Sequence, residues 1–175
     1  VVLDEAYYEY VPEAERAPSV EWIKEYPNLV VSRTFSKAYG LAGLRAGYAV
    51  SHEGIADVLN RIRQPFNMNS LSLKAAEVVL DDHAYLQKAV EVNAHGMKQL
   101  TDFCEGAGFN YIPSYGNFLT IEVGPDAEKL YDELLHEGVI VRPVTGYELP
   151  NHLLVSIGLP EENEAFIKAM KKLRG

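Results

Sequence analysis

The sequence predicts an α/β protein in which a mostly parallel sheet comes first and a small α+β unit follows it. Short apolar runs at residues 1–3, 29–32 and 46–50 alternate with polar or glycine-containing connections, as buried strands of such a sheet do. From residue 70 to residue 103, apolar side chains recur every three or four positions, which is the spacing of one helix face. Strands are therefore expected first, and long helices after them.

The remaining elements follow from the same patterns. A short helix is expected at residues 19–26, and two long helices are expected between 70 and 103, with a bend near Asp81-Asp82-His83. The Gly106-Ala107-Gly108 stop signal ends the second of them. Beyond it the pattern predicts strands and helices in the order strand 117–123, helix 126–136, strand 139–143, strand 152–157 and helix 160–173. We divide the chain into a sheet-containing part at 1–70, connecting helices at 71–108 and a small α+β domain at 109–175.

Composition narrows the classes of partner. The chain has 175 residues with 16 basic and 25 acidic side chains, a formal net charge of −9, which argues against nucleic acid or an anionic membrane as the main partner. The single cysteine, Cys104, has no second cysteine for an intrachain disulfide, and no apolar stretch approaches the length of a membrane span. A reducing, cytoplasmic setting is expected. The opening Val1-Val2-Leu3 run also leads us to expect further sequence upstream.

The strongest chemical signal is the segment from Ser32 to Tyr48, which is dense in hydroxyls and glycines and carries cations at Lys37 and Arg45. Glycine lets backbone approach a ligand, hydroxyls donate to phosphate oxygens, and an arginine fork can bind phosphate through two hydrogen bonds. The spacing matches neither the dinucleotide-binding nor the Walker phosphate loop. The segment therefore indicates an anion site, with a plain surface turn as the alternative.

A second signal is Leu3-Asp4-Glu5-Ala6-Tyr7, where an acid follows an apolar strand and a phenol comes three residues later. A carboxylate that caps the next element is the alternative interpretation. Ligands of open α/β sheets, however, gather beyond the carboxyl ends of strands, and both segments follow strands. We therefore expect Asp4 and Tyr7 to lie near Lys37.

Together these motifs resemble a known family. The sequence D-E-A-Y, followed by T-x-S-K and an arginine eight residues after the lysine, is similar to the fold type I pyridoxal-phosphate-dependent aminotransferases. Within them, it is most similar to the carboxyl-terminal half of the histidinol-phosphate aminotransferase branch. The likeness continues through residues 114–118, 138–143, 155–158 and 160–163. It implies that residues 1–70 are the last part of a large cofactor-binding domain.

The resemblance assigns roles to six residues around pyridoxal 5'-phosphate. Lys37 is expected to bind the cofactor as a Schiff base and then to move a proton between the substrate and the cofactor. Asp4 is expected to pair with the pyridine nitrogen, and Tyr7 to hydrogen-bond the phenolic oxygen. The phosphate is expected to be held by Thr34, Ser36 and Arg45.

Two further positions concern the substrate. Arg142 matches a substrate-side arginine of the family, whereas Leu154 stands where the family usually has an arginine for the substrate's acidic group. Strand alternation puts Leu154 on the face opposite to that of Leu153 and Val155, together with polar neighbours. We hypothesise that Leu154 marks altered specificity or lost activity.

The function implied is a transaminase of histidine biosynthesis, homodimeric when full-length. It would move an amino group between histidinol phosphate, or a related or aromatic amino compound, and 2-oxoglutarate. Half of the family's cofactor site lies outside these residues, so the fragment alone is expected to be inactive. Three alternatives stay open: an amino-acid phosphate decarboxylase of the same superfamily, a non-catalytic cofactor-sensing domain, and an inert fragment.

Other reactive side chains suggest no further site. The histidines lack the spacing of metal ligands, so no metal is expected. Cys104 lies on a predicted amphipathic helix ahead of Gly106, where we interpret it as a small buried hydrophobe and not as a nucleophile.

Overall fold

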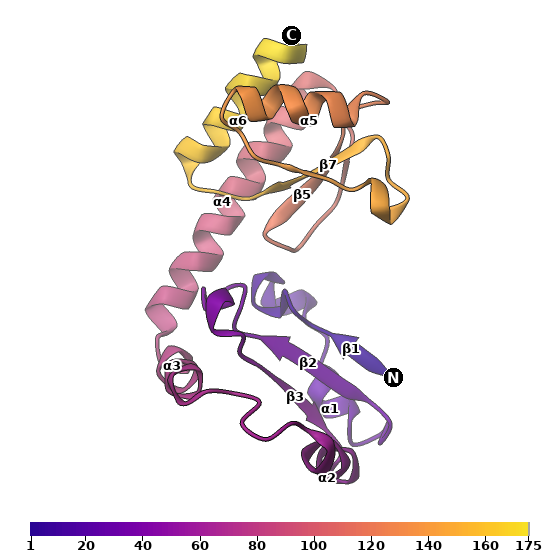
Figure 1. Cartoon of the computed structure of the whole chain (residues 1–175), viewed down its shortest axis with the longest axis vertical. Helices are drawn as coiled ribbons and strands as arrows, with labels where there is room; N and C mark the ends of the chain where they lie inside the picture. Colours follow the sequence, from indigo (N-terminus) through magenta and orange to yellow (C-terminus); the bar gives the residue numbers. More distant parts are fainter. Residues whose placement is uncertain (175) are drawn as a thin grey trace. The chain divides into compact units, whose positions relative to one another are not determined.

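A computed structural model describes residues 1–174. The chain folds into two compact units. The first unit comprises Val1–Val90 and the second begins at Glu91 (Figure 1). Each unit contains one sheet together with helices, so the predicted α/β fold is confirmed.

The first unit contains a sheet of three strands in the order β1-β2-β3. These are β1 (Val2–Asp4), β2 (Val30–Thr34) and β3 (Gly47–Ser51). The β1 and β2 strands are parallel, whereas β3 returns antiparallel to β2. Val31 is fully buried in the centre, where it packs with Ile23 and Leu29.

Helices of the first unit are α1 (Ser19–Trp22), α2 (Glu53–Ile62) and α3 (Ser70–Leu80), followed by the start of α4 (His83–Ala107). The α1 helix is shorter than the predicted 19–26, and the backbone beyond Trp22 continues in turns in which the Ile23 and Lys24 N–H groups donate to carbonyls three residues back. The α2 helix was not predicted. Asn69 begins α3 by accepting a hydrogen bond from the Ser72 backbone N–H at 2.9 Å.

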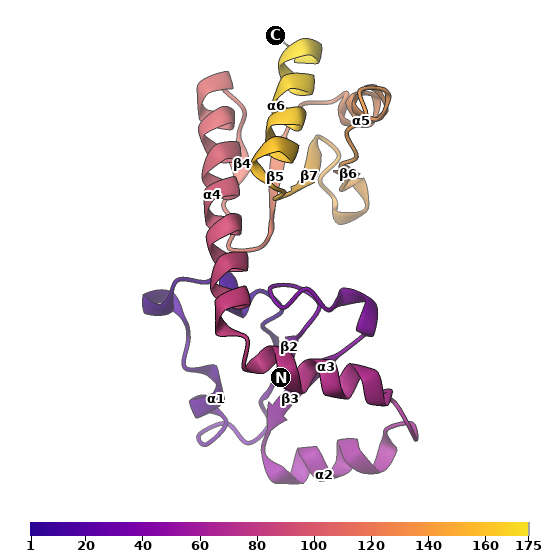
Figure 2. The ribbon, with the colours of Figure 1, turned by 90° about the vertical axis from the view of Figure 1, so that its left-hand side faces the viewer.

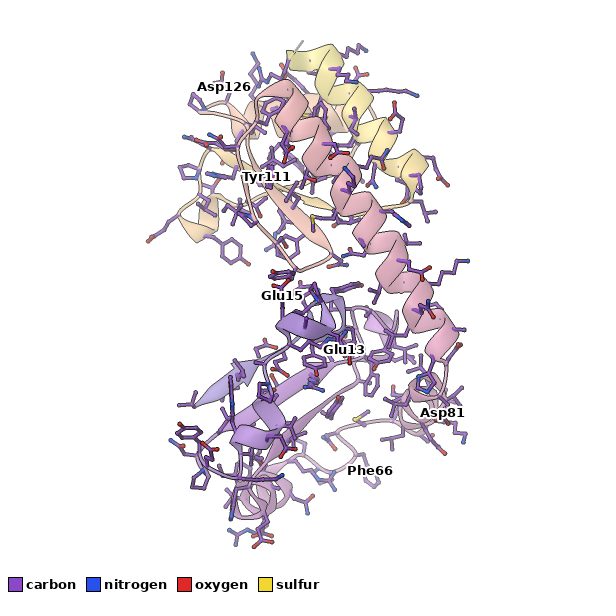
Figure 3. All side chains as sticks on the ribbon, turned by 180° about the vertical axis from the view of Figure 1, so that it is seen from behind. Glu13, Glu15, Phe66, Asp81, Tyr111 and Asp126 are labelled. Atoms are coloured by element: carbon purple, nitrogen blue, oxygen red, sulfur yellow. The ribbon has the colours of Figure 1, made fainter. Side chains whose placement is uncertain are left out.

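The predicted bend between the two long helices is confirmed at the junction of α3 and α4, where Figure 3 labels Asp81. Asp82 stabilises the start of α4, because its carboxylate accepts a hydrogen bond from the Tyr85 backbone N–H at 3.0 Å. Among residues 1–174, no helix combines the length and apolar composition needed to cross a membrane.

The second unit contains a sheet of four strands in the order β4-β5-β7-β6, and its neighbouring strands are antiparallel (Figure 2). The strands are β4 (Tyr111–Ile112), β5 (Phe118–Glu122), β6 (Arg142–Pro143) and β7 (His152–Ser156). The helices are α5 (Ala127–His136), α6 (Pro160–Arg174) and the later part of α4.

One continuous core fills the second unit. The alternation predicted for β7 is confirmed, because Leu153 and Val155 are 0% and 4% exposed whereas Leu154 is half-buried. Side chains from β5 and from all three helices pack with them, namely Leu119, Ile121, Leu100, Cys104, Leu130, Leu134, Phe166 and Met170. The helices therefore pack against the sheet face that carries Leu153, and Leu154 belongs to the opposite face.

Candidate functional site

The ends of β1 and β2 bring the two chemical motifs of the first unit together. Asp4 is the last residue of β1 and pairs in register with Ser32 of β2. The Asp4 carboxylate accepts hydrogen bonds from the Ala6 backbone N–H at 3.1 Å and from the Ser32 hydroxyl at 3.4 Å. Because β1 and β2 are parallel, both strands end at the same edge, and the Lys37 loop leaves from that edge.

Lys37 and Tyr7 meet beyond these strand ends. The Lys37 ammonium nitrogen lies 5.1 Å from the centroid of the Tyr7 ring, within the range of a cation–π interaction. Both side chains are half-buried. The contact joins a residue that follows β1 to one that follows β2, as the sequence predicts.

Thr34, Ser36 and Arg45 form one connected polar cluster. The Thr34 hydroxyl accepts a hydrogen bond from the Ser36 backbone N–H at 3.1 Å. The Arg45 guanidinium donates to the Ser36 hydroxyl at 3.3 Å and to the Ala42 carbonyl at 2.8 Å, and its side chain is exposed. Hydroxyls beside an exposed guanidinium fit a phosphate group, since all of them can donate to its oxygens.

Backbone hydrogen bonds and the buried Phe35 side chain hold the loop that carries this cluster. The buried Phe35 closes the loop through backbone hydrogen bonds, because its N–H donates to the Ala46 carbonyl and its carbonyl accepts from the Leu41 N–H, at 3.1 and 2.9 Å. Gly40 adopts a φ of +70°, and a Cβ at this position would collide with the Tyr85 hydroxyl. A larger residue at position 40 would therefore be disfavoured by its backbone angle, and the Tyr85 side chain would have to move.

Glu5 and Arg33 lie beside the candidate site although no sequence motif assigns them a role. Their side chains form an ion pair with 2.9 Å between the Arg33 Nη2 and a Glu5 carboxylate oxygen, and the side chains are only 15% and 11% exposed. Strand alternation could have revealed that these neighbours of Asp4 and Ser32 point to the other face of the sheet. The pairing itself joins positions far apart in the sequence.

The substrate-side candidates lie in the second unit, on strands β6 and β7. Arg142 pairs in register with Leu154, and Thr120 of β5 pairs with Leu154 from the other side. Residues directly opposite in antiparallel strands point to the same face, so these three side chains share one face. The Arg142 guanidinium donates to the Tyr147 hydroxyl at 3.3 Å and lies 5.6 Å from the centre of the Tyr147 ring.

A separate hollow of about 790 Å³ lies in the first unit, at the loop between α2 and α3. Its lining residues are Asn60, Arg63, Gln64, Pro65, Phe66, Asn67, Met68 and Leu73, which include no predicted site residue. Figure 3 labels Phe66, which is 96% exposed with a positive φ of 58°. This hollow is therefore a feature apart from the candidate site.

Other reactive side chains form no second site in the described residues. In the part of the chain that the structure describes, no cluster of three or more His, Cys, Asp or Glu side chains could hold a metal ion. Cys104 is fully buried, and burial together with the charge of Glu105 raises the pKa of its thiol to about 11. The prediction that Cys104 is a buried hydrophobe is confirmed.

Comparison with known proteins gives the family context. Residues 1–170 match the family model described as aminotransferase class I and II. The chain is 91% identical over its whole length to histidinol-phosphate aminotransferase 1 of Idiomarina loihiensis, of which it covers 48%. It is 57% identical to histidinol-phosphate aminotransferase 1 of Mannheimia succiniciproducens, over 99% of this chain and 47% of that one. The chain thus spans about half the length of the curated relatives it matches.

Solved structures agree with this relationship. Histidinol-phosphate aminotransferase from Sinorhizobium meliloti, in complex with pyridoxal-5'-phosphate, is 31% identical with a TM-score of 0.87, over 98% of this chain and 49% of that one. L-threonine-O-3-phosphate decarboxylase from Porphyromonas gingivalis is 25% identical with a TM-score of 0.82, over 98% and 54%. The family model covers almost the whole chain, and the resemblance seen in its motifs is confirmed. This chain therefore belongs to the class I and II aminotransferases.

Proposed function

We propose that this chain is the part of a pyridoxal-phosphate-dependent aminotransferase that carries the cofactor-binding lysine. The observation that carries the proposal is the meeting of two motifs at one sheet edge, where Asp4 ends β1, Tyr7 follows it, and Lys37 follows β2. The amino donor is histidinol phosphate or a related or aromatic amino compound, and 2-oxoglutarate is the acceptor. The names of the relatives support histidinol phosphate as the donor.

The residues present fit each part of the cofactor. The cluster of Thr34, Ser36 and Arg45 offers hydroxyl and guanidinium donors for the phosphate. The Asp4 carboxylate, fixed by Ser32 and the Ala6 N–H, can accept a hydrogen bond from the protonated pyridine nitrogen. When bound, pyridoxal phosphate supplies an electron sink that stabilises negative charge at the α-carbon of the substrate.

Each side chain has a defined task in this proposal. Lys37 would bind the cofactor covalently, and as a free amine it would move the proton at the α-carbon of the substrate. Asp4 holds a proton on the pyridine nitrogen. The Tyr7 hydroxyl donates to the phenolic oxygen and keeps the ring in one orientation.

The substrate side combines one cation with one apolar side chain. Arg142 offers a guanidinium to an anionic group of the amino donor, while Leu154 on the adjacent strand offers only apolar contact. A charge-assisted hydrogen bond is worth about 1.5–3 kcal/mol, so an arginine at 154 would bind an anionic donor more tightly by that amount. We therefore propose that Leu154 weakens or changes the selection of anionic donors.

Turnover belongs to a full-length chain that contains these residues, because this chain spans about half of its curated relatives. We propose that the full-length protein is a cytoplasmic homodimer of histidine biosynthesis. We also propose that residues 1–70 belong to a large domain, that residues 71–108 form connecting helices, and that residues 109–175 form a small domain.

The cofactor assignment is tested by titrating this chain with pyridoxal phosphate and recording the visible absorbance of the lysine-bound cofactor. We expect a saturable band that is absent in Lys37→Ala. The matched control is Lys24→Ala. Lys24 is an exposed lysine in the turn after α1, where it pairs with Glu21. Its replacement should leave the band unchanged. A band of equal size in Lys37→Ala would contradict the assignment.

A second candidate function is decarboxylation of an amino-acid phosphate. The likeness to the Porphyromonas gingivalis decarboxylase, at 25% identity over 98% of this chain, favours it. Product analysis on the full-length chain separates the two reactions. Release of carbon dioxide from the donor indicates the decarboxylase, whereas formation of a keto product and glutamate from 2-oxoglutarate indicates the aminotransferase.

A further inference from the structure

A half-buried ion pair lies on the other face of the sheet from the Asp4 carboxylate. Two nitrogens of the Arg33 guanidinium, Nε and Nη2, each lie 2.9 Å from the same Glu5 carboxylate oxygen. Glu5 directly follows Asp4, and its backbone N–H donates to the Ser32 carbonyl at 2.9 Å, which extends the β1–β2 pairing by one step. Because side chains alternate along extended backbone, Glu5 and Arg33 face away from Asp4 and Ser32.

Aromatic side chains hold the Arg33 guanidinium in place. Its central carbon lies 3.6 Å from the centroid of the Tyr8 ring, as close as a stacked guanidinium. Tyr48 pairs in register with Arg33 across β2 and β3, so the two side chains share one face of the sheet. Arg33 thus contacts Tyr8 in the segment after β1 and lies beside Tyr48 of β3.

Arg16 makes several contacts within the segment after β1. Arg16 lies 5.0 Å from the Tyr8 ring centroid and donates hydrogen bonds to the backbone carbonyls of Val11 and Glu9, at 2.9 and 3.1 Å. The turn that follows Tyr7 therefore folds back on itself, and Tyr8 joins it to Arg33 of β2.

Charge on Arg33 is maintained in spite of burial. Burial disfavours the charged guanidinium, but the interactions with Glu5 and Tyr48 outweigh this effect, so the pKa of Arg33 lies above its ordinary value. A buried ion pair of this kind contributes little net stability, because desolvation offsets the attraction between the charges. Its main physical effect is to fix geometry, since the planar arginine fork admits few orientations.

We propose that Glu5, Arg33 and Tyr8, together called the rear clamp, are positioning residues for the candidate cofactor site. The clamp ties the segment carrying Asp4 and Tyr7 to the strand that leads to Thr34 and Lys37. It thereby sets the spacing between the group that faces the pyridine nitrogen and the groups that hold the phosphate and the aldehyde carbon. The inference rests on the proposed function, because it takes these residues as the cofactor's partners.

The clamp is tested in the full-length chain with pyridoxal phosphate bound, using Arg33→Met, Arg33→Lys and Glu5→Gln. The readouts are the visible circular dichroism per bound cofactor, which reports ring orientation, and kcat measured separately from KM. We expect Arg33→Met to lower kcat by about tenfold to a hundredfold and to change the visible dichroism, with little change in KM for the amino donor. Arg33→Lys keeps the charge and should recover part of both.

A matched control breaks an ion pair elsewhere. Glu137→Gln removes the partner of Lys172, whose ammonium lies 2.7 Å from the Glu137 carboxylate in the second unit, and should leave kcat and the dichroism unchanged. Unchanged kcat and dichroism in Arg33→Met would overturn the clamp while leaving the proposed function intact.

The remaining outcomes also decide the question. If Arg33→Met fails to fold, Glu5→Gln replaces it, because it removes one charge with almost no change of shape. A folded Glu5→Gln protein with unaltered dichroism and kcat would show that the clamp is only structural. If the unaltered protein forms no lysine-bound cofactor band, the proposed function fails, and the clamp fails with it.

Discussion

The two units bury their apolar residues very differently. The second unit has one continuous core that draws on β5, β7 and all three of its helices. The first unit has two small clusters of three buried residues each, one formed by Ile23, Leu29 and Val31 and the other by Phe35, Ala46 and Ala76. Buried apolar area is the main source of stability, so the second unit should be the more stable one.

The first unit instead exposes both apolar and reactive groups. Large apolar side chains such as Ile62, Phe66 and Leu71 are 71%, 96% and 77% exposed. The charged side chains of Asp4 and Arg45, at the candidate site, are exposed as well. In this chain, which spans about half the length of its curated relatives, the candidate site therefore lies in the unit with the smaller core.

The largest expected effect comes from the same substitution made in both cores. Leu130→Ala removes a fully buried side chain from the second unit and should lower the free energy of unfolding of that unit by about 2–5 kcal/mol. Leu29→Ala, in a three-residue cluster, should fall near the lower end of that range. Denaturant unfolding followed by circular dichroism measures both. Equal losses for the two variants would contradict the contrast between the cores.

The reactivity of the buried Cys104 thiol reports how often the core of the second unit opens to solvent. Burial and the charge of Glu105 raise the pKa of its thiol from 9.0 to about 11, which lowers the thiolate fraction at neutral pH by about a hundredfold. We expect a thiol reagent to label the folded chain slowly and the urea-unfolded chain at once. Rapid labelling of the folded chain would show that this core opens readily.

The substrate face of the second unit is tested by Leu154→Arg in the full-length chain. The new guanidinium would lie across from Arg142 and should lower KM for a phosphate-bearing donor by roughly tenfold to a hundredfold, which corresponds to one charge-assisted hydrogen bond. Leu135→Arg, on α5 of the same unit, is the control for added charge. An unchanged KM for every anionic donor would count against Leu154 as a specificity position.

The smallest effect concerns Glu9, next to the rear clamp in the first unit. Burial raises its pKa above 4.5, although its own backbone N–H and the charges of Arg33 and Arg16 act in the opposite direction. The folded state therefore binds this proton more tightly, and the stability it contributes is present below the unfolded pKa and is lost as the pH rises through the folded pKa. Glu9→Gln should stabilise the first unit at neutral pH, and the gain should vanish in acid. A less stable Glu9→Gln protein at neutral pH would show that the arginine charges outweigh burial.

Local patterns in the sequence predicted much of the fold. The alternation of Leu153, Leu154 and Val155 correctly assigned the faces of β7, because a buried face imposes a period of two on the strand. The bend at Asp81 was also predicted from local polar residues. The α2 helix was missed although Ile55, Val58, Leu59 and Ile62 follow helical spacing, and β4 is only two residues long, too short to leave a pattern.

The candidate site was predicted less completely. The rule that ligands gather at strand ends predicted the contact between Tyr7 and Lys37, while their individual roles came from the family resemblance. The pairing of Arg33 with Glu5 depends on the register of β1 and β2, across 28 positions of sequence. The pairing of Arg142 with Leu154 likewise depends on how β6 returns to β7. Contacts of this kind are set by tertiary structure and leave no local signal.

The central claim is that Lys37 is the residue that binds the cofactor. The most direct measurement is to incubate the chain with pyridoxal phosphate, reduce the carbon–nitrogen bond with borohydride, and locate the modified lysine by peptide mass spectrometry. We predict stoichiometric modification in the peptide that contains Lys37, with only traces at exposed lysines such as Lys98. Modification spread evenly over the exposed lysines, with none enriched at Lys37, would contradict the account.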